Sequence, residues 1–156
     1  MSGYLSHQVL LLEWREPMFK SILVPVNFTD TDRAAVEVAR DLATGDDCKL
    51  TLLHVIETIR DVPFEDLAEF YQPLEQKARE GMAALAEPLV GESLNVEQRV
   101  IYGKRAQEIM AYAHQHDQDL IVLTARPPDP ERMGEIWGTI SHQVAILAHC
   151  PVLLVK

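Results

Sequence analysis

The sequence predicts a doubly wound α/β domain, in which a five-stranded parallel β-sheet is covered by helices on both faces. Short, continuously apolar runs alternate with segments whose apolar residues recur at helical spacing. The segments between the strands are long enough for right-handed βαβ crossovers. The chain has 156 residues, which suffice for one domain with a sizeable core but not for two ordinary ones.

The first strand and helix are predicted at residues 19–26 and 29–45. FKSILVPV, residues 19–26, is β-branched, apolar throughout and ends near Pro25, as buried parallel strands do. The following segment repeats apolar residues at helical spacing. Thr29 to Asp32 supply N-cap chemistry and Gly45 a stop signal.

The second βα unit comprises KLTLLHVI, residues 49–56, and a long helix over residues 63–87. Residues 49–56 form another buried strand on the same grounds. The helix is predicted from one apolar stripe, which consists of Leu67, Phe70, Tyr71, Leu74, Ala78, Met82 and Leu85.

The remaining three strands are predicted at residues 95–102, 119–125 and 151–155. NVEQRVIY, residues 95–102, breaks clean alternation but fits the order of elements. A helix over residues 105–114 is expected to bury Ala106, Ile109, Met110 and Ala113. DLIVLTA forms the fourth strand, residues 138–148 the last helix, and PVLLV the last strand.

Residues 1–17 are interpreted as an extension that precedes a domain of residues 18–156. The apolar run from Val9 to Leu12, with Trp14, is far shorter than the roughly 20 residues that cross a bilayer. We expect it to add a strand to a sheet edge or to cover the ligand cleft, because an exposed run of this kind is unfavourable. Its deletion is then expected to lower stability or to change the oligomeric state.

Composition excludes several classes of partner. The formal net charge is −10 and the pI about 4.9, with no Lys/Arg-rich run, so nucleic acids and anionic membranes are disfavoured. Cys48 and Cys150 make no metal pattern and are expected to be structural thiols in a reducing cytoplasm. HQHDQD, residues 114–119, lacks metal-ligand spacing and is interpreted as a solvated connection.

Four segments in this order resemble the universal stress protein family. They are FKSILVPV, TLLHVI, GKRAQEIMAYA followed by DQDLIVLTA, and WGTISHQVAILAHCPVLLV. The resemblance covers Met18 to Lys156. It implies a five-stranded parallel α/β domain, usually a homodimer that pairs through the last strand, here Val152 to Val155.

One branch of that family binds ATP, and its motif is altered in this chain. The motif has an acidic residue after the first strand, then G-x-x-G, nine residues and G-S/T. Gly138 and Thr139 match the last pair, whereas Pro128 and Ala125 replace the two loop glycines and Asn27 replaces the acidic residue. The candidate cleft implied by the resemblance comprises Pro25, Asn27, Val55 (at the adenine-facing position), Ala125, Arg126, Gly138 and Thr139.

The loop chemistry favours altered or lost nucleotide binding. Pro127 and Pro128 have no N–H to donate to a phosphate. Asp129 and Glu131 repel a polyphosphate, whereas Arg126 and Arg132 offer charge-assisted hydrogen bonds to it. Asn27 and the Gly138–Thr139 pair have structural explanations as well, in a turn and in a helix N-cap.

Catalysis is not indicated, because no nucleophile motif, Walker loop or paired carboxylates are present. Ser141 and His142 are neighbours on one helix and point apart, and His54 is interpreted as a core or rim residue. We expect a cytoplasmic, dimeric, non-catalytic regulatory protein that acts through protein contacts and has no cofactor. The alternative is an ATP-binding switch with at most slow hydrolysis.

Overall fold

The predicted doubly wound fold is confirmed by a computed structural model, which describes residues 17–44, 47–125, 131 and 138–156. Five parallel strands form one sheet in the order β3-β2-β1-β4-β5. Residues 1–16, most of the predicted extension, lie outside the described residues, as does the predicted stop at Gly45. The strands are β1 Ser21–Pro25, β2 Lys49–Glu57, β3 Asn95–Gly103, β4 Leu120–Thr124 and β5 Val152–Val155.

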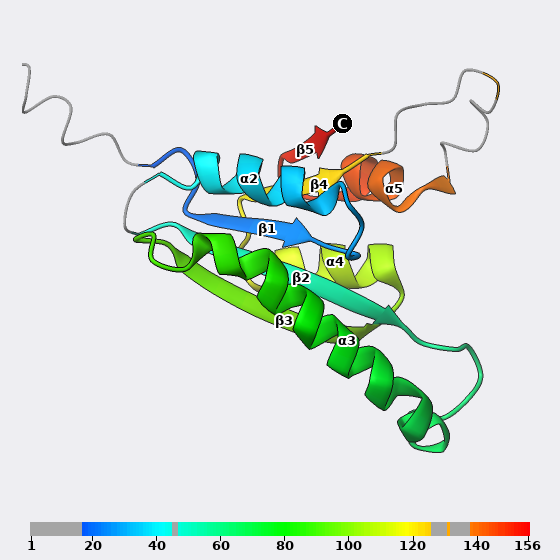
Figure 1. Ribbon diagram of the computed structural model, residues 1–156. Coiled ribbons are helices and arrows are strands. Elements are labelled where there is room, and N and C mark those ends of the chain that lie inside the picture. The colour runs from blue at the N-terminus through cyan, green and yellow to red at the C-terminus, as the bar shows by residue number, and fades with distance from the viewer. Residues whose placement is uncertain (1–16, 45–46, 126–130, 132–137) are drawn as a thin grey trace, which may run out of the picture.

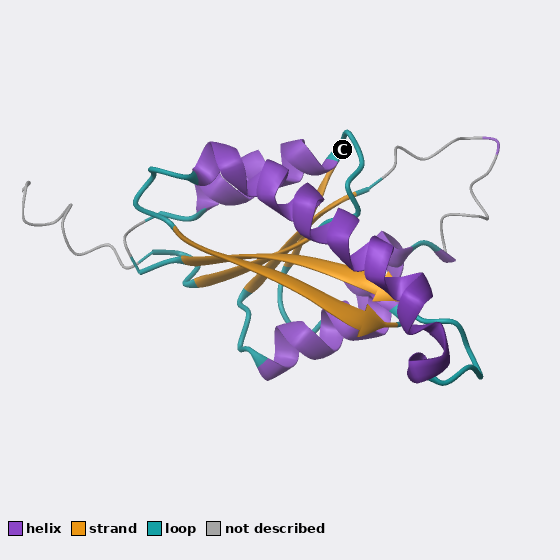
Figure 2. Cartoon of the chain, turned by 60° about the horizontal axis from the view of Figure 1, so that its bottom comes forward, coloured by secondary structure: helices purple, strands orange, loops and turns teal. Residues whose placement is uncertain are grey.

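Helices cover both faces of this sheet, as Figures 1 and 2 show. They are α2 Asp32–Leu42, α3 Ala68–Ala86, α4 Arg105–Gln115 and α5 Ile140–Leu147, with 3₁₀ turns at Phe64–Leu67 and Glu87–Leu89. The first two pack in one apolar cluster and the last two in another. The molecule therefore has three layers, and both faces of each central strand are buried.

Side-chain alternation along β1 explains why its sequence is apolar without a break. Ile22 and Val24 face the cluster beneath α2 and α3, whereas Leu23 faces the cluster beneath α4 and α5. All three are fully buried. A central strand in a parallel sheet has no solvent face, so every position selects an apolar side chain.

The predicted stripe of the long helix is wrong at its first turns. Phe70 is 51% exposed and Leu74 is 38% exposed, while Tyr71, Ala78 and Met82 are buried. The beginning of α3 extends past the ends of β2 and β3 (Figure 1), so only one narrow line of its side chains meets the sheet. In α4, the expected burial of Met110 is likewise only partial, and Tyr112 is buried instead.

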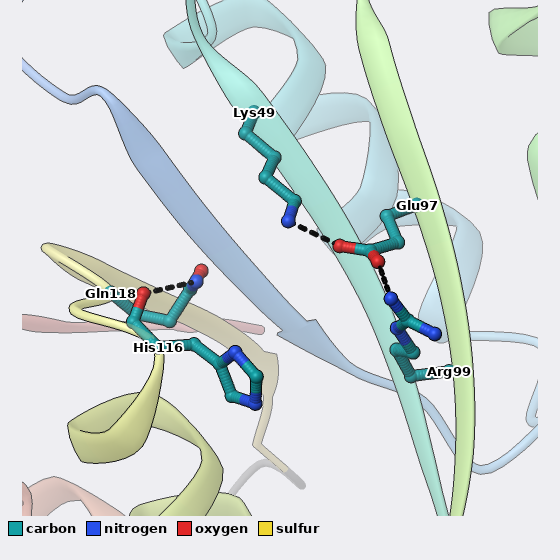
Figure 3. A network of polar contacts seen from close by, with 5 residues as sticks. All are labelled: Lys49, Glu97, Arg99, His116 and Gln118. Atoms are coloured by element: carbon teal, nitrogen blue, oxygen red, sulfur yellow. Dashed lines mark hydrogen bonds and ion pairs between the residues drawn. The ribbon is translucent and has the colours of Figure 1, made fainter.

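The two edges of the sheet differ in chemistry. On β3, Glu97 forms ion pairs with Arg99 and with Lys49 of the neighbouring β2 (Figure 3). Such charges oppose pairing with another strand, as expected of a protected edge. The other edge, β5, is the apolar segment VLLV. The same figure shows the α4–β4 turn, which Gln118 closes by donating to the carbonyl of His116 at 3.1 Å.

Among the helices of the described residues, none is long and apolar enough to cross a membrane.

Candidate functional site

The carboxyl edge of the sheet holds the predicted cleft residues that the structure describes. Strand order reverses between β1 and β4, and ligands of such sheets bind outside the carboxyl ends at this point. Pro25 is buried at the end of β1, and Asn27 is exposed two residues later. Ala125 follows β4 and donates its N–H to Val155 at 2.9 Å. Arg126, Pro127 and Pro128 lie outside the described residues.

Asp32, the first residue of α2, organises this edge. Its carboxylate is 2% exposed and accepts hydrogen bonds from the N–H groups of Asn27, at 2.8 Å, and Thr29, at 3.0 Å. Its second oxygen accepts from the Thr124 hydroxyl at 3.3 Å. One side chain thus joins the β1–α2 loop to the end of β4. The sequence indicated capping in this region, but Thr31, at the N-cap, makes no side-chain cap.

Gly138 and Thr139 form the beginning of α5. The Thr139 hydroxyl accepts from the N–H of His142 at 3.3 Å, so the predicted N-cap role is confirmed. Gln143 donates to the Gly138 carbonyl at 3.0 Å. Among the described residues other than its chain neighbours, none has an atom within 4 Å of a Cβ built on Gly138.

His54 on β2 is tied to the loop after β1. Its Nδ1 lies 2.8 Å from the Val26 carbonyl, and its ring packs on Phe28 with centroids 4.5 Å apart. Burial lowers the pKa of His54 below its ordinary value, which favours the neutral ring. These contacts agree with the interpretation of His54 as a core or rim residue whose polar ring is hydrogen-bonded within the protein.

Val55 lies in the core rather than on an open surface. It is 3% exposed and belongs to the same apolar cluster as Ala106 and Ile109. The structure therefore brings Asn27, Ala125, Gly138 and Thr139 to one edge of the sheet, with Val55 beneath α4.

Two observations bear on catalytic and metal-binding chemistry at the described part of this edge. Ser141 has its hydroxyl 3.3 Å from the Thr139 hydroxyl. Within the described residues, no group of three or more His, Cys, Asp or Glu side chains is arranged to hold a metal ion.

A groove lies beyond the carboxyl ends of β2 and β3, and the sequence analysis did not single it out. We call it the β2–β3 groove. It is lined by residues 57–61, which comprise the last residue of β2 and the loop after it, by residues 104–107 at the start of α4, and by Ile140 and Gln143 of α5. Its volume is about 610 Å³. The sequence signal that could have indicated this groove is the pair Lys104–Arg105 directly after β3, because the carboxyl ends of parallel strands lie at one edge of the sheet.

The fold is that of a doubly wound α/β protein, and its candidate site lies at the carboxyl edge of the sheet, where the strand order reverses. The universal stress protein family profile matches residues 18–156, and the chain belongs to that family. A universal stress protein of Methanocaldococcus jannaschii is 26% identical over 148 residues, covering 90% of this chain and 84% of the relative. One of Thermus aquaticus is 30% identical over 145 residues, covering 89% and 100%.

Solved structures of the family share the architecture. UspA of Lactobacillus plantarum superposes with a TM-score of 0.72 at 27% identity, covering 88% of this chain and 97% of that one. Two more distant structures are described with nucleotides. An Arabidopsis thaliana protein has AMP bound (21% identity, TM-score 0.63), and another universal stress protein is in complex with cAMP (20%, 0.65). At these identities the likeness shows the fold alone.

Proposed function

We propose that this chain is a non-catalytic, dimeric regulatory member of the universal stress protein family in the cytoplasm, and that nucleotide binding in the usual family pose is lost or altered. The observation that carries the proposal is that polar groups at the carboxyl edge of the sheet are already hydrogen-bonded within the protein. Asp32 occupies the N–H groups of Asn27 and Thr29, and the Thr139 hydroxyl caps α5. In the sequence, prolines stand where the family loop offers backbone donors.

A nucleotide-binding experiment tests this part of the proposal. Thermal unfolding is measured with and without Mg-ATP, since a ligand at a hundred times its Kd adds about 2.7 kcal/mol of stability. The matched variant is Gly138→Val, whose Cβ meets none of the described residues within 4 Å but whose side chain is expected to obstruct a phosphate at the start of α5. Stabilisation by Mg-ATP that Gly138→Val removes, or steady ATP hydrolysis, contradicts the proposal.

The dimer is supported by the contrast between the two edges. β5 is uncharged, and the neighbouring helix exposes Ile146 (61%) and Leu147 (65%), whereas β3 carries ion pairs. Exposed apolar sheet edges are normally covered, and a two-fold axis brings the same segment of both chains together. We therefore place Val152–Val155 at the centre of the interface.

Sedimentation tests this interface with substitutions at exposed positions. Leu153→Glu places a charge on β5 and Leu147→Glu one at the end of the neighbouring α5, and both are expected to give monomers. The matched control is Val90→Glu, on a residue that is 80% exposed in the turn before β3. A wild-type monomer at micromolar concentration, or dissociation by the control as well, contradicts the proposed interface.

The alternative function is an ATP-binding switch with at most slow hydrolysis. One observation favours it: the family's glycine and threonine pair is kept at the beginning of α5, where the helix dipole attracts anions. The AMP and cAMP complexes of the distant relatives are consistent with either function. The Gly138→Val comparison separates the two.

A further inference from the structure

Most of the large apolar side chains that are exposed among the described residues fall in two segments of the chain. One is residues 146–153, at the end of α5 and on β5, which the proposed dimer buries. The other is residues 59–74, before and within the beginning of α3. From the second segment, Val62, Phe64, Phe70 and Leu74 form what we call the α3 patch, and none of the four lines the β2–β3 groove. Concentrated apolar exposure of this kind marks a binding surface more often than scattered single residues do.

The position of α3 explains why the α3 patch is exposed. The beginning of this helix extends past the ends of β2 and β3 (Figure 1), so the sheet offers its first turns little to pack against. Residues 57–66, which lead into the helix, are exposed throughout. The aromatic side chains there add little to the core of the domain, and a second molecule is needed to bury them.

The two phenylalanines of the α3 patch are held in place by buried neighbours. Phe64 stacks on Tyr71 with ring centroids 5.1 Å apart and meets Tyr102 edge-on at 5.0 Å. Phe70 contacts the same Tyr71 ring at 5.3 Å, so Tyr71, which is 2% exposed, joins the two. Phe64 remains 45% exposed and Phe70 51% exposed. Aromatic side chains that are already ordered lose little entropy on binding, which suits them as anchors of an interface.

Carboxylates flank these anchors in the chain. Glu65 follows Phe64 directly, and Glu69 precedes Phe70. Glu65, Asp66 and Glu69 are exposed, and within the described residues no ion pair or side-chain hydrogen bond engages them. Residues 57–75 contain six carboxylates and one cation, Arg60. The α3 patch therefore combines an apolar centre with negative charge.

This combination determines which partner fits. Apolar side chains together with Lys or Arg complement the patch in both hydrophobicity and charge. A second copy of the patch would bring like charges together, which disfavours self-association. Anionic membranes and nucleic acids are repelled for the same reason. The patch also has no strand edge to which a partner strand could pair, whereas a helix satisfies its own backbone hydrogen bonds.

From these observations we propose that the α3 patch is the docking surface for a basic amphipathic helix of a partner protein. Phe64 and Phe70 anchor the apolar face of that helix. Glu65, Asp66 and Glu69 form ion pairs with its Lys and Arg side chains. The inference rests on the proposed function in one respect, namely that a non-catalytic regulator acts by binding a partner.

Fluorescence anisotropy with two designed peptides tests the surface. The probe is a helical peptide of about five turns that carries Leu on one face and Lys on the other. The second peptide keeps every Leu and has Glu in place of Lys. We expect only the Leu/Lys peptide to bind, and its affinity to fall as NaCl rises from about 0.05 to about 0.5 M, because salt screens exposed charges. A wild-type protein that does not bind the Leu/Lys peptide, or that binds both peptides equally, overturns the inference.

Matched variants locate the docking surface. Phe70→Ala is expected to weaken peptide binding by about tenfold or more, as the loss of an interface anchor does. Its control is Val90→Ala, on a residue that is 80% exposed beyond the end of α3. Glu69→Lys is likewise expected to weaken binding, and its control is Glu37→Lys at an exposed position on α2. Equal affinities within either pair overturn the inference, and circular dichroism of each variant confirms folding.

The oligomeric state and the ATPase activity of the same proteins distinguish this inference from the proposed function. A Phe70→Ala protein that becomes monomeric in sedimentation assigns the α3 patch to contacts between copies of this chain and overturns the inference. Steady ATP hydrolysis together with peptide binding that Phe70→Ala weakens supports the inference and overturns the proposed function alone. Peptide binding that only the Phe70 and Glu69 variants weaken, in a dimer without ATP hydrolysis, supports both.

Discussion

Replacing Asp32 by alanine tests whether a single buried carboxylate holds the carboxyl edge together. The substitution removes the acceptor for the N–H groups of Asn27, at 2.8 Å, and Thr29, at 3.0 Å. It also removes the weaker contact with the Thr124 hydroxyl at 3.3 Å. The loop after β1 then loses its link to both α2 and β4.

The expected loss follows from these bonds. A hydrogen bond to a charged group contributes about 1.5–3 kcal/mol, and an acidic residue in a first helical turn adds about 0.3–1 kcal/mol. Asn27 and Thr29 are exposed, so once the carboxylate is gone water accepts hydrogen bonds from their N–H groups and offsets part of the loss. We therefore expect Asp32→Ala to lower the free energy of unfolding by about 2–3 kcal/mol. Thr124→Val, which loses only the long bond, is expected to cost about 0.5 kcal/mol.

Urea unfolding at neutral pH measures the difference, with Asp30→Ala as the matched control. Asp30 is exposed two residues earlier, so its loss changes the net charge equally without removing these bonds. Asp32→Asn keeps the shape and one acceptor and is expected to fall between the two alanine variants. If Asp32→Ala and Asp30→Ala unfold within about 0.5 kcal/mol of each other, the range of ordinary surface substitutions, the structural role of Asp32 is refuted.

Three further predictions concern the core and α3. Thr51 is fully buried with no partner for its hydroxyl in the described part of the chain, so Thr51→Val is expected to add about 1 kcal/mol of stability in denaturant unfolding; a loss contradicts this. A Cβ at Gly81 would lie 2.5 Å from the Phe28 ring, so Gly81→Ala should lower the melting temperature. In a Phe28→Gly background, Gly81→Ala should raise the melting temperature, because alanine favours helix. A change of the same sign in both backgrounds refutes the clash. Burial and the hydrogen bond to Glu75 raise the pKa of Tyr102 to about 12, so its contribution to stability is complete below pH 10 and lost as the pH rises towards 12. Ultraviolet titration of wild type and Tyr102→Phe checks this, and a tyrosine signal near pH 10 for Tyr102 contradicts it.

The sequence by itself determined the fold class, the order of the elements and the family. Buried parallel strands need apolar side chains on both faces, so residues 19–26, 49–56 and 119–125 contain long apolar runs. The N-cap at Thr139 was also readable, because capping depends on a local hydrogen bond between neighbours in the chain.

Burial on α3 required the tertiary structure. Helical spacing predicted Phe70 and Leu74 on the same stripe as Tyr71. Periodicity identifies an apolar face but does not show how far the sheet extends beneath it. Since α3 begins beyond the ends of β2 and β3, its first turns have little to pack against (Figure 1).

The candidate site was likewise predictable from the sequence only in part. The resemblance to the family implied Asn27, Ala125, Gly138 and Thr139 as cleft residues. The rule that carboxyl ends of parallel strands lie together added only that the strand ends belong at one edge. The roles of Asp32 and of the β2–β3 groove followed from neither, because they depend on contacts between residues far apart in the chain, such as Asp32 with Thr124 and Arg105 with Glu57. A pattern of residue types records local spacing and face, whereas the partner of a buried or half-buried charge is decided by how the crossovers bring the loops together.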